Sequence, residues 1–352
     1  WLKPSLERTR VGFAPQFASM VDRGVRTAVV RSDWLVEYWN WEKRCCELTV
    51  RLKDVVMSHQ KFVGVAAVSV DRTLLVACER LGLSATVWNM KTGESVAILA
   101  GHALPVTAMA FSPDAASVAT GDEGGLVRVW STVSGDCILT LEGHKKVVTE
   151  LVWAQLPLCS QTLLASASLD CSVRLWGDPH AGAGAAALVL EPPEACRTHQ
   201  VQAWELAPDA VFSLDLSPDG EQVAGGMLSG HVVVWGARKG ENRFAIDGHR
   251  ASVRQVAFSP SGGMLATCAF EEGSVMLWTV EEQSLGLLQA MKIVSLQSLL
   301  WLSDEFVGTS QSFPHWSMRL WDLGSTTIQG GPREIGKREM HDSAIALLVA
   351  PR

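Results

Sequence analysis

Short runs of alternating apolar and polar residues, each bounded by a turn signal, recur along most of the chain. In residues 106–144, VTAMAFSPDAASVATGDEGGLVRVWSTVSGDCILTLEGH, four such runs are separated by Ser-Pro-Asp or Gly-rich clusters. Alternation with a period of two is typical of β-strands that are buried on one face. The pattern therefore predicts units of four short antiparallel strands and an all-β fold.

A tryptophan after a branched or apolar pair marks one strand in each unit. Successive markers are roughly 43 residues apart, a period typical of repeat architectures, with one longer interval. The seven markers are Trp39, Trp88, Trp130, Trp176, Trp235, Trp278 and Trp321. Seven such units account for almost the whole chain.

A histidine followed four positions later by a branched residue runs in phase with the tryptophans. Three of these histidines sit in a Gly-His pair. The five positions are His59, His102, His144, His249 and His341. Two markers that keep phase indicate that one structural unit is repeated.

With these Gly-His pairs and with Trp321-Asp322, the units resemble the WD-repeat β-propeller family over about residues 25–350. The resemblance implies an all-β fold: a seven-bladed β-propeller of four-stranded antiparallel blades over residues 25–352. Residues 1–24 precede the repeats and are expected to form an N-terminal arm.

The resemblance also implies a buried network of His, Ser or Thr, Asp and Trp in each blade. A buried imidazole and a buried indole N–H each need a hydrogen-bond partner. The fourth unit supplies the full set, namely His144, Ser166, Asp170 and Trp176.

Other units carry incomplete sets. The third keeps His102, Thr120 and Trp130 but has Gly124 at the position expected for Asp, and the sixth keeps His249 and Trp278 with Glu272 near the acidic position. The fifth and seventh units lack the His, so apolar packing is expected to hold those blades. All these histidines are expected to be structural.

The first unit offers only three strands, at about residues 25–31, 34–40 and 45–52. The apolar run 344–350 has the right length to supply the missing innermost strand, with Ile345 near Val29. An open ring would leave an unpaired strand edge. We therefore expect this run to close a seven-bladed ring, with a network of His341, Asp33 and Trp39 at the junction.

An Ala-, Gly- and Pro-rich insertion at about residues 177–200 lengthens the fourth unit. Such composition is typical of an excursion from the repeat rather than of a domain. The outer strand of the fourth blade is either residues 186–190 or residues 201–206. The second alternative is the one we expect.

Composition and motifs exclude several functional classes. The net charge is −7 and no run of Lys and Arg occurs, which argues against a nucleic-acid groove. No apolar stretch is long enough to span a bilayer. Eight Cys without a CxxC pair indicate reduced thiols in an intracellular, cytoplasmic protein.

Candidate catalytic motifs lack the context that their chemistry requires. Residues 182–187 and 331–338 partly match nucleotide-binding loops but lie outside a strand–turn–helix unit. Acidic turn residues such as Asp114 are expected to be solvated surface groups that tolerate replacement within about 0.5 kcal/mol. We therefore expect no enzyme activity, no catalytic residue, no cofactor, no metal and no small-molecule substrate.

Loops on a rigid scaffold remain as the candidate binding elements. Trp34 in the first unit and Phe313, Pro314 and Trp316 in the seventh are expected near one seam of the ring, as an anchor for a partner protein. The alternative that these rings pack into their own blades stays open.

Two functions follow. The leading prediction is a non-catalytic protein–protein interaction scaffold, a subunit of a larger assembly with several protein partners. The alternative is a module that recognises a peptide or modified tail in the central funnel, as in chromatin or ubiquitin-ligase complexes. Residues 38–43, YWNWEK, are similar to a stretch of cilia- and flagella-associated WD-repeat proteins, which suggests a ciliary or cytoskeletal setting.

Overall fold

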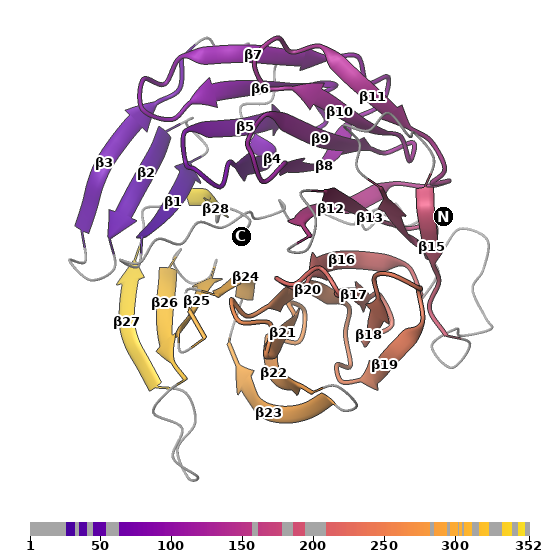
Figure 1. The fold of residues 1–352 in the computed structure, drawn as a ribbon. Helices are drawn as coiled ribbons and strands as arrows, with labels where there is room; N and C mark the ends of the chain where they lie inside the picture. The colour runs from indigo at the N-terminus through magenta and orange to yellow at the C-terminus, as the bar shows by residue number, and fades with distance from the viewer. Residues whose placement is uncertain are drawn as a thin grey trace, which may run out of the picture.

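The computed structural model describes most of the seven units. The described residues are 26–31, 35–40, 45–53, 63–156, 161–177, 186–193, 209–281, 285–293, 296–301, 303–304, 306–311, 317–323, 333–339 and 344–348. Within them the fold is all-β, with 28 strands in seven four-stranded antiparallel sheets. We number the sheets 1–7 in the order of the units. They follow one another around a common centre, as in a β-propeller (Figure 1).

Sheets 1–4 contain the first half of the strands. Sheet 1 consists of β28 (Ala344–Leu348), β1 (Arg26–Arg31), β2 (Leu35–Asn40) and β3 (Cys45–Arg51). Sheet 2 consists of β4 (Val63–Val68), β5 (Leu74–Glu79), β6 (Ser84–Asn89) and β7 (Ser95–Ala100). Sheet 3 consists of β8 (Val106–Phe111), β9 (Ser117–Asp122), β10 (Val127–Ser131) and β11 (Cys137–Leu141). Sheet 4 consists of β12 (Val148–Gln155), β13 (Thr162–Ser168), β14 (Val173–Trp176) and β15 (Ala186–Leu190).

Sheets 5–7 repeat the same order. Sheet 5 consists of β16 (Val211–Leu216), β17 (Gln222–Met227), β18 (His231–Gly236) and β19 (Asn242–Asp247). Sheet 6 consists of β20 (Val253–Phe258), β21 (Met264–Ala269), β22 (Ser274–Val280) and β23 (Leu285–Lys292). Sheet 7 consists of β24 (Leu296–Trp301), β25 (Phe306–Gln311), β26 (Ser317–Asp322) and β27 (Arg333–Glu339).

The last strand that the structure describes joins the first sheet. β28 pairs antiparallel with β1, and Val29 lies opposite Leu347. The register shifts between Val30 and Arg31, which face Ala346 and Ala344. Ile345 is the extra residue at this irregularity, so it lies two positions along the strand from the residue opposite Val29.

The outer strand of sheet 4 corrects one prediction. β15 (Ala186–Leu190) pairs with β14, and Val173 faces Leu190, so the expectation that residues 201–206 form this strand was wrong. Leu190 is 1% exposed and packs in the core between sheets 4 and 5. Burial of this side chain gives the 186–190 run a packing role that the sequence pattern does not reveal.

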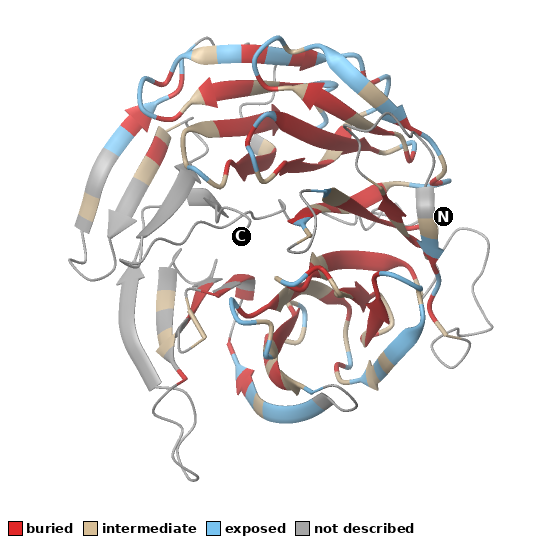
Figure 2. Ribbon diagram, in the orientation of Figure 1, coloured by how far each residue is buried: buried red, intermediate tan, exposed pale blue. Residues whose placement is uncertain are grey.

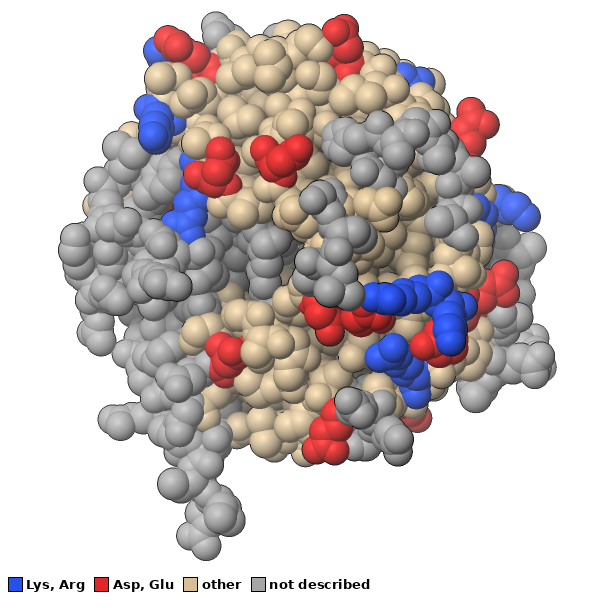
Figure 3. Space-filling view, in the orientation of Figure 1, with Lys and Arg blue, Asp and Glu red and all other residues tan. Residues whose placement is uncertain are grey.

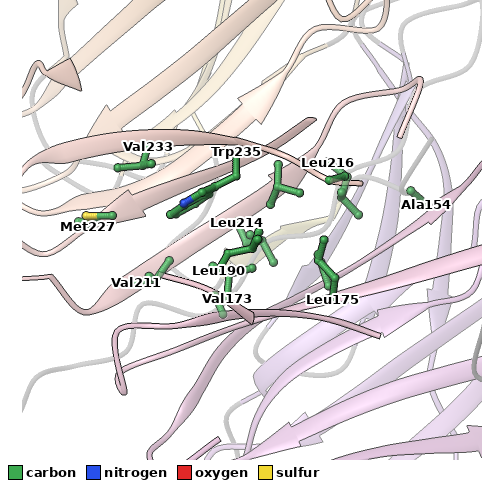
Figure 4. Packing of buried hydrophobic residues seen from close by; sticks show 14 residues of the cluster. Ala154, Val173, Leu175, Leu190, Val211, Leu214, Leu216, Met227, Val233 and Trp235 are labelled. Carbon is green, nitrogen blue, oxygen red and sulfur yellow. The ribbon is translucent and has the colours of Figure 1, made fainter. Parts of the chain in front are cut away.

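Apolar side chains fill the spaces between neighbouring sheets. Separate clusters join sheets 2 and 3, 3 and 4, 4 and 5, 5 and 6, and 6 and 7. Figure 4 shows the cluster between sheets 4 and 5, in which Trp235 lies above Leu214 and Leu190. The outer strands β7, β11, β19 and β23 carry most of the exposed strand positions (Figure 2).

Each marker tryptophan sits at an irregularity of the sheet. In every sheet the register between the third and fourth strands shifts immediately before the marker Trp, for example between Val87 and Trp88. Such a bulge bends the strand and turns its side chain. The repeated Trp therefore marks a repeated backbone feature as well as a core side chain.

The turn after three of these bulges requires glycine. Gly93, Gly135 and Gly240 have φ values of 71°, 76° and 72°. Each packs against the outer strand of the preceding sheet; a Cβ on Gly135 would lie 2.8 Å from the carbonyl oxygen of Ile98. These glycines allow close contact between consecutive sheets.

Candidate functional site

The histidine-centred network of sheet 3 is fully buried. Trp130 Nε1–H donates to Thr120 Oγ1 over 2.7 Å, and the Thr120 hydroxyl lies 2.7 Å from His102 Nε2. His102 Nδ1 lies 2.8 Å from Asp122 Oδ2. With the hydroxyl donating to Nε2 and Nδ1–H donating to the carboxylate, every polar group in this chain of hydrogen bonds is satisfied.

Asp122 is the acid that the sequence pattern missed. Gly124 occupies the position where Asp was expected, and a Cβ there would lie 2.8 Å from Leu104 Cδ1. Asp122 instead reaches the imidazole from the end of β9, two residues after Thr120. Its second oxygen, Oδ1, accepts the N–H groups of Gly124 at 2.9 Å and Leu126 at 3.0 Å. In the sequence, the signal that could have identified this acid is an Asp two residues after the Thr that bonds the marker Trp.

The four residues expected in sheet 4 lie together. His144 Nε2 is 2.7 Å from Ser166 Oγ, and His144 Nδ1 is 3.0 Å from Asp170 Oδ2. Trp176 Nε1–H donates to Ser166 Oγ over 2.9 Å. Asp170 also accepts hydrogen bonds from the Ser172 hydroxyl at 2.6 Å and from the Lys145 N–H at 2.9 Å.

Hydrogen bonding keeps both acids ionised. Burial alone raises the pKa of Asp122, but hydrogen bonds from His102 and from the backbone outweigh it, so the pKa lies below its ordinary value. Burial likewise opposes ionisation of Asp170, whereas His144, Ser172 and Lys145 lower its pKa further. Donors aimed at a carboxylate favour its charged form.

Sheet 6 has a variant of the network without an acid on the imidazole. His249 Nε2 is 2.8 Å from Thr267 Oγ1, and Nδ1 is 2.8 Å from Ser274 Oγ. Trp278 Nε1–H donates to Thr267 over 2.9 Å. Glu272, expected near the acidic position, accepts the Arg250 N–H instead. Burial lowers the pKa of His249, and the charge of Glu272 offsets part of this effect.

Two sheets satisfy their marker Trp by a different route. Trp88 donates to the Lys53 carbonyl at 2.8 Å, and Trp235 donates to the Glu191 carbonyl at 3.2 Å. Both acceptors follow the outer strand of the preceding sheet. Ala77 and Gly225 stand at the register position of Thr120, so no hydroxyl is available there.

The glycine of two Gly-His pairs has a steric role. Gly101 and Gly143 have φ values of 150° and 156°. A Cβ on Gly101 would lie 3.0 Å from Arg128 Nη1, and the Arg174 guanidinium covers Gly143 in the same way. The motif therefore places an arginine over the backbone that leads to the histidine.

Two further predicted residues lie in the described part of the chain, whereas His341, Asp33 and the four candidate partner anchors lie outside it. The seventh marker, Trp321, donates to Thr309 Oγ1 over 2.9 Å. Trp39 is placed on β2 opposite Thr27, but its side chain is not described. The other residues of the expected first-blade network and of the expected partner anchor are His341, Asp33, Trp34, Phe313, Pro314 and Trp316.

The described residues offer little chemistry beyond these networks. No group of three or more His, Cys, Asp or Glu in the described ranges could hold a metal ion. Burial raises the pKa of the Cys78 and Cys171 thiols to about 12, so both are protonated at neutral pH. No helix among these residues is long and apolar enough to cross a membrane.

Part of the chain is similar in sequence to known proteins. The Periodic tryptophan protein 2 homolog of Dictyostelium discoideum is 28% identical over 62% of this chain and 22% of its own length. Nuclear distribution protein PAC1 of Fusarium vanettenii is 30% identical over 47% of this chain and 34% of its own length. The chain thus spans only a minor part of these relatives.

A solved structure extends the comparison to the whole fold. The crystal structure of the computationally designed Ika8 protein superposes with a TM-score of 0.65 at 20% identity, covering 94% of this chain and 93% of that chain. Residues 93–131, 135–177 and 240–279 match the family model of the WD domain, G-beta repeat. The chain therefore carries WD40 repeats in three places along an all-β fold of four-stranded antiparallel sheets.

Proposed function

We propose that this chain is a non-catalytic scaffold that holds partner proteins in a larger assembly. One observation carries the proposal: an exposed apolar patch at the junction of sheets 2 and 3. Leu81, Leu83 and Leu104 are 59%, 48% and 44% exposed. Exposed apolar groups on rigid turns are typical of protein interaction sites. We call these three residues the leucine patch.

Backbone hydrogen bonds hold the leucine patch together. Val106 N–H donates to the Gly82 carbonyl over 2.9 Å, which joins the β5–β6 turn to the segment entering sheet 3. Glu123 N–H donates to the Pro105 carbonyl over 3.0 Å, which fixes that segment to the next turn. The three leucines are therefore presented on pre-organised loops, which lowers the entropy cost of binding.

Leu81 adopts an unfavourable backbone conformation. Its φ is 64°, where a bulky residue costs about 1–2 kcal/mol; other turns of this chain place Gly125, Gly230, Gly273 or Cys171 in this conformation. A glycine at position 81 would relieve this strain. An exposed leucine in this strained conformation favours a role in binding over a role in stability.

Charge supports protein partners over nucleic acid. On the face shown in Figure 3, the described Lys and Arg side chains do not form a continuous stripe and alternate with Asp and Glu. A groove for nucleic acid needs clustered positive charge. We infer that the partners are proteins, with neither nucleic acid nor a small-molecule substrate.

The test compares two surface variants. Affinity-tagged chains carrying Leu81→Ser with Leu104→Ser, or Val133→Ser as a matched control, are used to recover bound proteins, which mass spectrometry then quantifies. Val133 is 80% exposed on a turn of sheet 3. We expect the patch variant alone to lose its partners, with an unchanged Tm. Equal recovery by both variants would exclude the leucine patch as the docking site.

Several finer expectations remain part of the proposal. The pairing of β28 with β1 supports a closed seven-bladed ring. Trp34, Phe313, Pro314 and Trp316 remain candidate partner anchors, to be tested by release of a partner from Phe313→Ala with Trp316→Ala. A cytoplasmic location is proposed. The relatives reported above do not support the ciliary setting expected from residues 38–43.

The alternative function is recognition of a peptide or modified tail in the central funnel, as in chromatin or ubiquitin-ligase complexes. Nothing in the described geometry favours it over the scaffold. Full partner recovery by both the leucine-patch variant and the Phe313 and Trp316 variant would favour it, because those changes leave the innermost strands intact.

A further inference from the structure

On the innermost strands, some side chains form hydrogen bonds with backbone groups of the next sheet. The clearest case joins sheets 6 and 7. Gln255 Oε1 accepts the Leu299 N–H over 2.8 Å, and Gln255 Nε2 donates to the Leu299 carbonyl over 2.7 Å. The side-chain amide thus forms hydrogen bonds with both the backbone N–H and the backbone carbonyl of one residue, Leu299, on the innermost strand of the next sheet. We call this two-point contact the Gln255 clasp.

Glu150 occupies the same position in sheet 4. Both residues directly follow the register shift at the start of their strand, between Val148 and Glu150 and between Val253 and Gln255. Their partners also correspond, because Leu214 and Leu299 each come one residue after the shift in the next strand. Glu150 Oε2 accepts the Leu214 N–H over 2.6 Å.

The surroundings of Glu150 disfavour a charge. Glu150 is partly buried as a residue, and the withdrawal of its carboxyl group from water is the main cause that raises its pKa to about 8. The Leu214 N–H lowers this pKa, and the carboxylate of Asp215 raises it. Asp215 itself accepts the N–H groups of Leu216 at 2.9 Å and Phe258 at 2.7 Å.

Other charged groups are few on the strands packed against β12. β8 and β13 carry no titratable side chain. β9 carries Asp122, which is hydrogen-bonded to His102, and β16 carries Asp215. The described residues on these strands therefore place no cation beside Glu150 to hold it ionised.

We propose that Glu150 is a proton-dependent clasp: as a neutral acid it grips Leu214 as Gln255 grips Leu299, and its ionisation loosens the junction of sheets 4 and 5. In the acid form one oxygen accepts the Leu214 N–H and the hydroxyl supplies the donor that the amide of Gln255 supplies. Ionisation removes this donor and adds a negative charge next to Asp215.

Leu214, which donates its N–H to Glu150, belongs to the apolar cluster between sheets 4 and 5. Leu214 is buried in the cluster that contains Leu190 and Trp235 (Figure 4). The backbone position of Leu214 sets how its side chain enters this cluster. A change at Glu150 is therefore expected to act on the packing of both sheets.

The test is the pH dependence of Tm for the wild-type chain and for Glu150→Gln, measured between pH 5 and pH 9. The folded pKa of Glu150 is raised, so its stabilising contribution is complete below the unfolded value of 4.5 and is lost as pH rises towards about 8. We expect equal Tm values near pH 5. The variant should gain over wild type as pH rises and keep a constant advantage above pH 8.

The reciprocal variant Gln255→Glu provides the matched control at the equivalent position. It should lose stability with rising pH while matching wild type near pH 5, and Glu150→Gln should not alter that loss. A Tm difference between Glu150→Gln and wild type that does not change with pH would overturn the proposal. So would a Glu150→Gln variant that is less stable than wild type at pH 8.

Discussion

His102 and Asp122 form a buried imidazole–carboxylate pair, with Nδ1 2.8 Å from Oδ2, across the start and the end of the first hairpin of sheet 3. In sheet 4 the corresponding acid, Asp170, comes from the turn after the strand. The same imidazole–carboxylate contact is thus made from two backbone positions. The imidazole requires only that a carboxylate oxygen lies within hydrogen-bond distance of Nδ1, wherever the backbone of that acid runs.

Loss of Asp170 should destabilise sheet 4. Asp170→Ala removes the acceptor of His144, Ser172 and the Lys145 N–H, and stranded buried donors cost about 1–3 kcal/mol. Asp136→Ala is the control, because Asp136 is exposed in a turn of sheet 3 and should change stability by less than about 0.5 kcal/mol. Urea unfolding measures both. Equal midpoints would show that the network does not stabilise the fold.

Asp114 should also matter, contrary to the expectation from sequence. Asp114 Oδ1 accepts the Ser112 hydroxyl at 2.6 Å and the Ala116 N–H at 3.0 Å, so the turn is held by its side chain. Asp114→Ala is expected to cost about 1 kcal/mol in the free energy of unfolding. Asp114→Asn, which keeps an acceptor oxygen, should recover most of the loss. If both variants match wild type, the Asp114 contacts contribute nothing.

The sequence predicted the repeat well because the strand period, the marker Trp and the marker His all depend on local residue spacing. It failed at Asp122 and at β15 for tertiary reasons. Asp122 is the partner of His102 because its carboxylate lies beside the imidazole in the folded chain, and its position along the sequence does not reveal this contact. Residues 201–206, VQAWEL, mix apolar and polar residues and residues 186–190, AALVL, do not, but Leu190 packs in the cluster that contains Trp235, a tertiary contact that the strand pattern does not reveal.

Gly135 tests the contact between consecutive sheets. Its φ of 76° and its approach to Ile98 O make Gly135→Ala unfavourable by about 1–3 kcal/mol. Gly177→Ala is the matched control, since a Cβ there would meet nothing within 4 Å and no positive φ is required. Thermal melts should separate the two variants. A Gly177→Ala variant that melts as low as Gly135→Ala would refute this explanation.

Acid should weaken sheets 3 and 4 through their buried carboxylates. The pKa values of Asp122 and Asp170 are lowered from 3.8, so their stabilising contribution is present above that value and is lost as pH falls below it. Tm should therefore drop steeply below about pH 4 in wild type. Asp170→Asn should show a shallower drop than Asp136→Asn. Identical acid profiles for these two variants would contradict the proposed cause.

Removal of β28 tests whether the first and last units depend on each other. β28 is the only described partner of β1 on its inner side, and the pairing includes Val29 with Leu347 and Val30 with Ala346. Deletion of residues 344–352 exposes the edge of β1, and an unpaired apolar edge promotes association with other chains. We expect a markedly lower Tm and aggregation in light scattering.

The matched control is deletion of residues 349–352, which leaves β28 and its pairing with β1 intact. The shorter deletion should melt like the full chain and stay monodisperse, because the described strand β28 ends at Leu348. Two variants separate pairing from packing. Ala346→Pro with Leu347→Pro removes two successive N–H groups, one of which faces β1, whereas Leu347→Ala keeps the backbone donors and loses the side chain. If the ladder holds the two ends of the chain together, the proline variant should behave like the long deletion and the alanine variant should not. A monomeric long-deletion variant with the wild-type Tm would show that sheet 1 is stable with three strands.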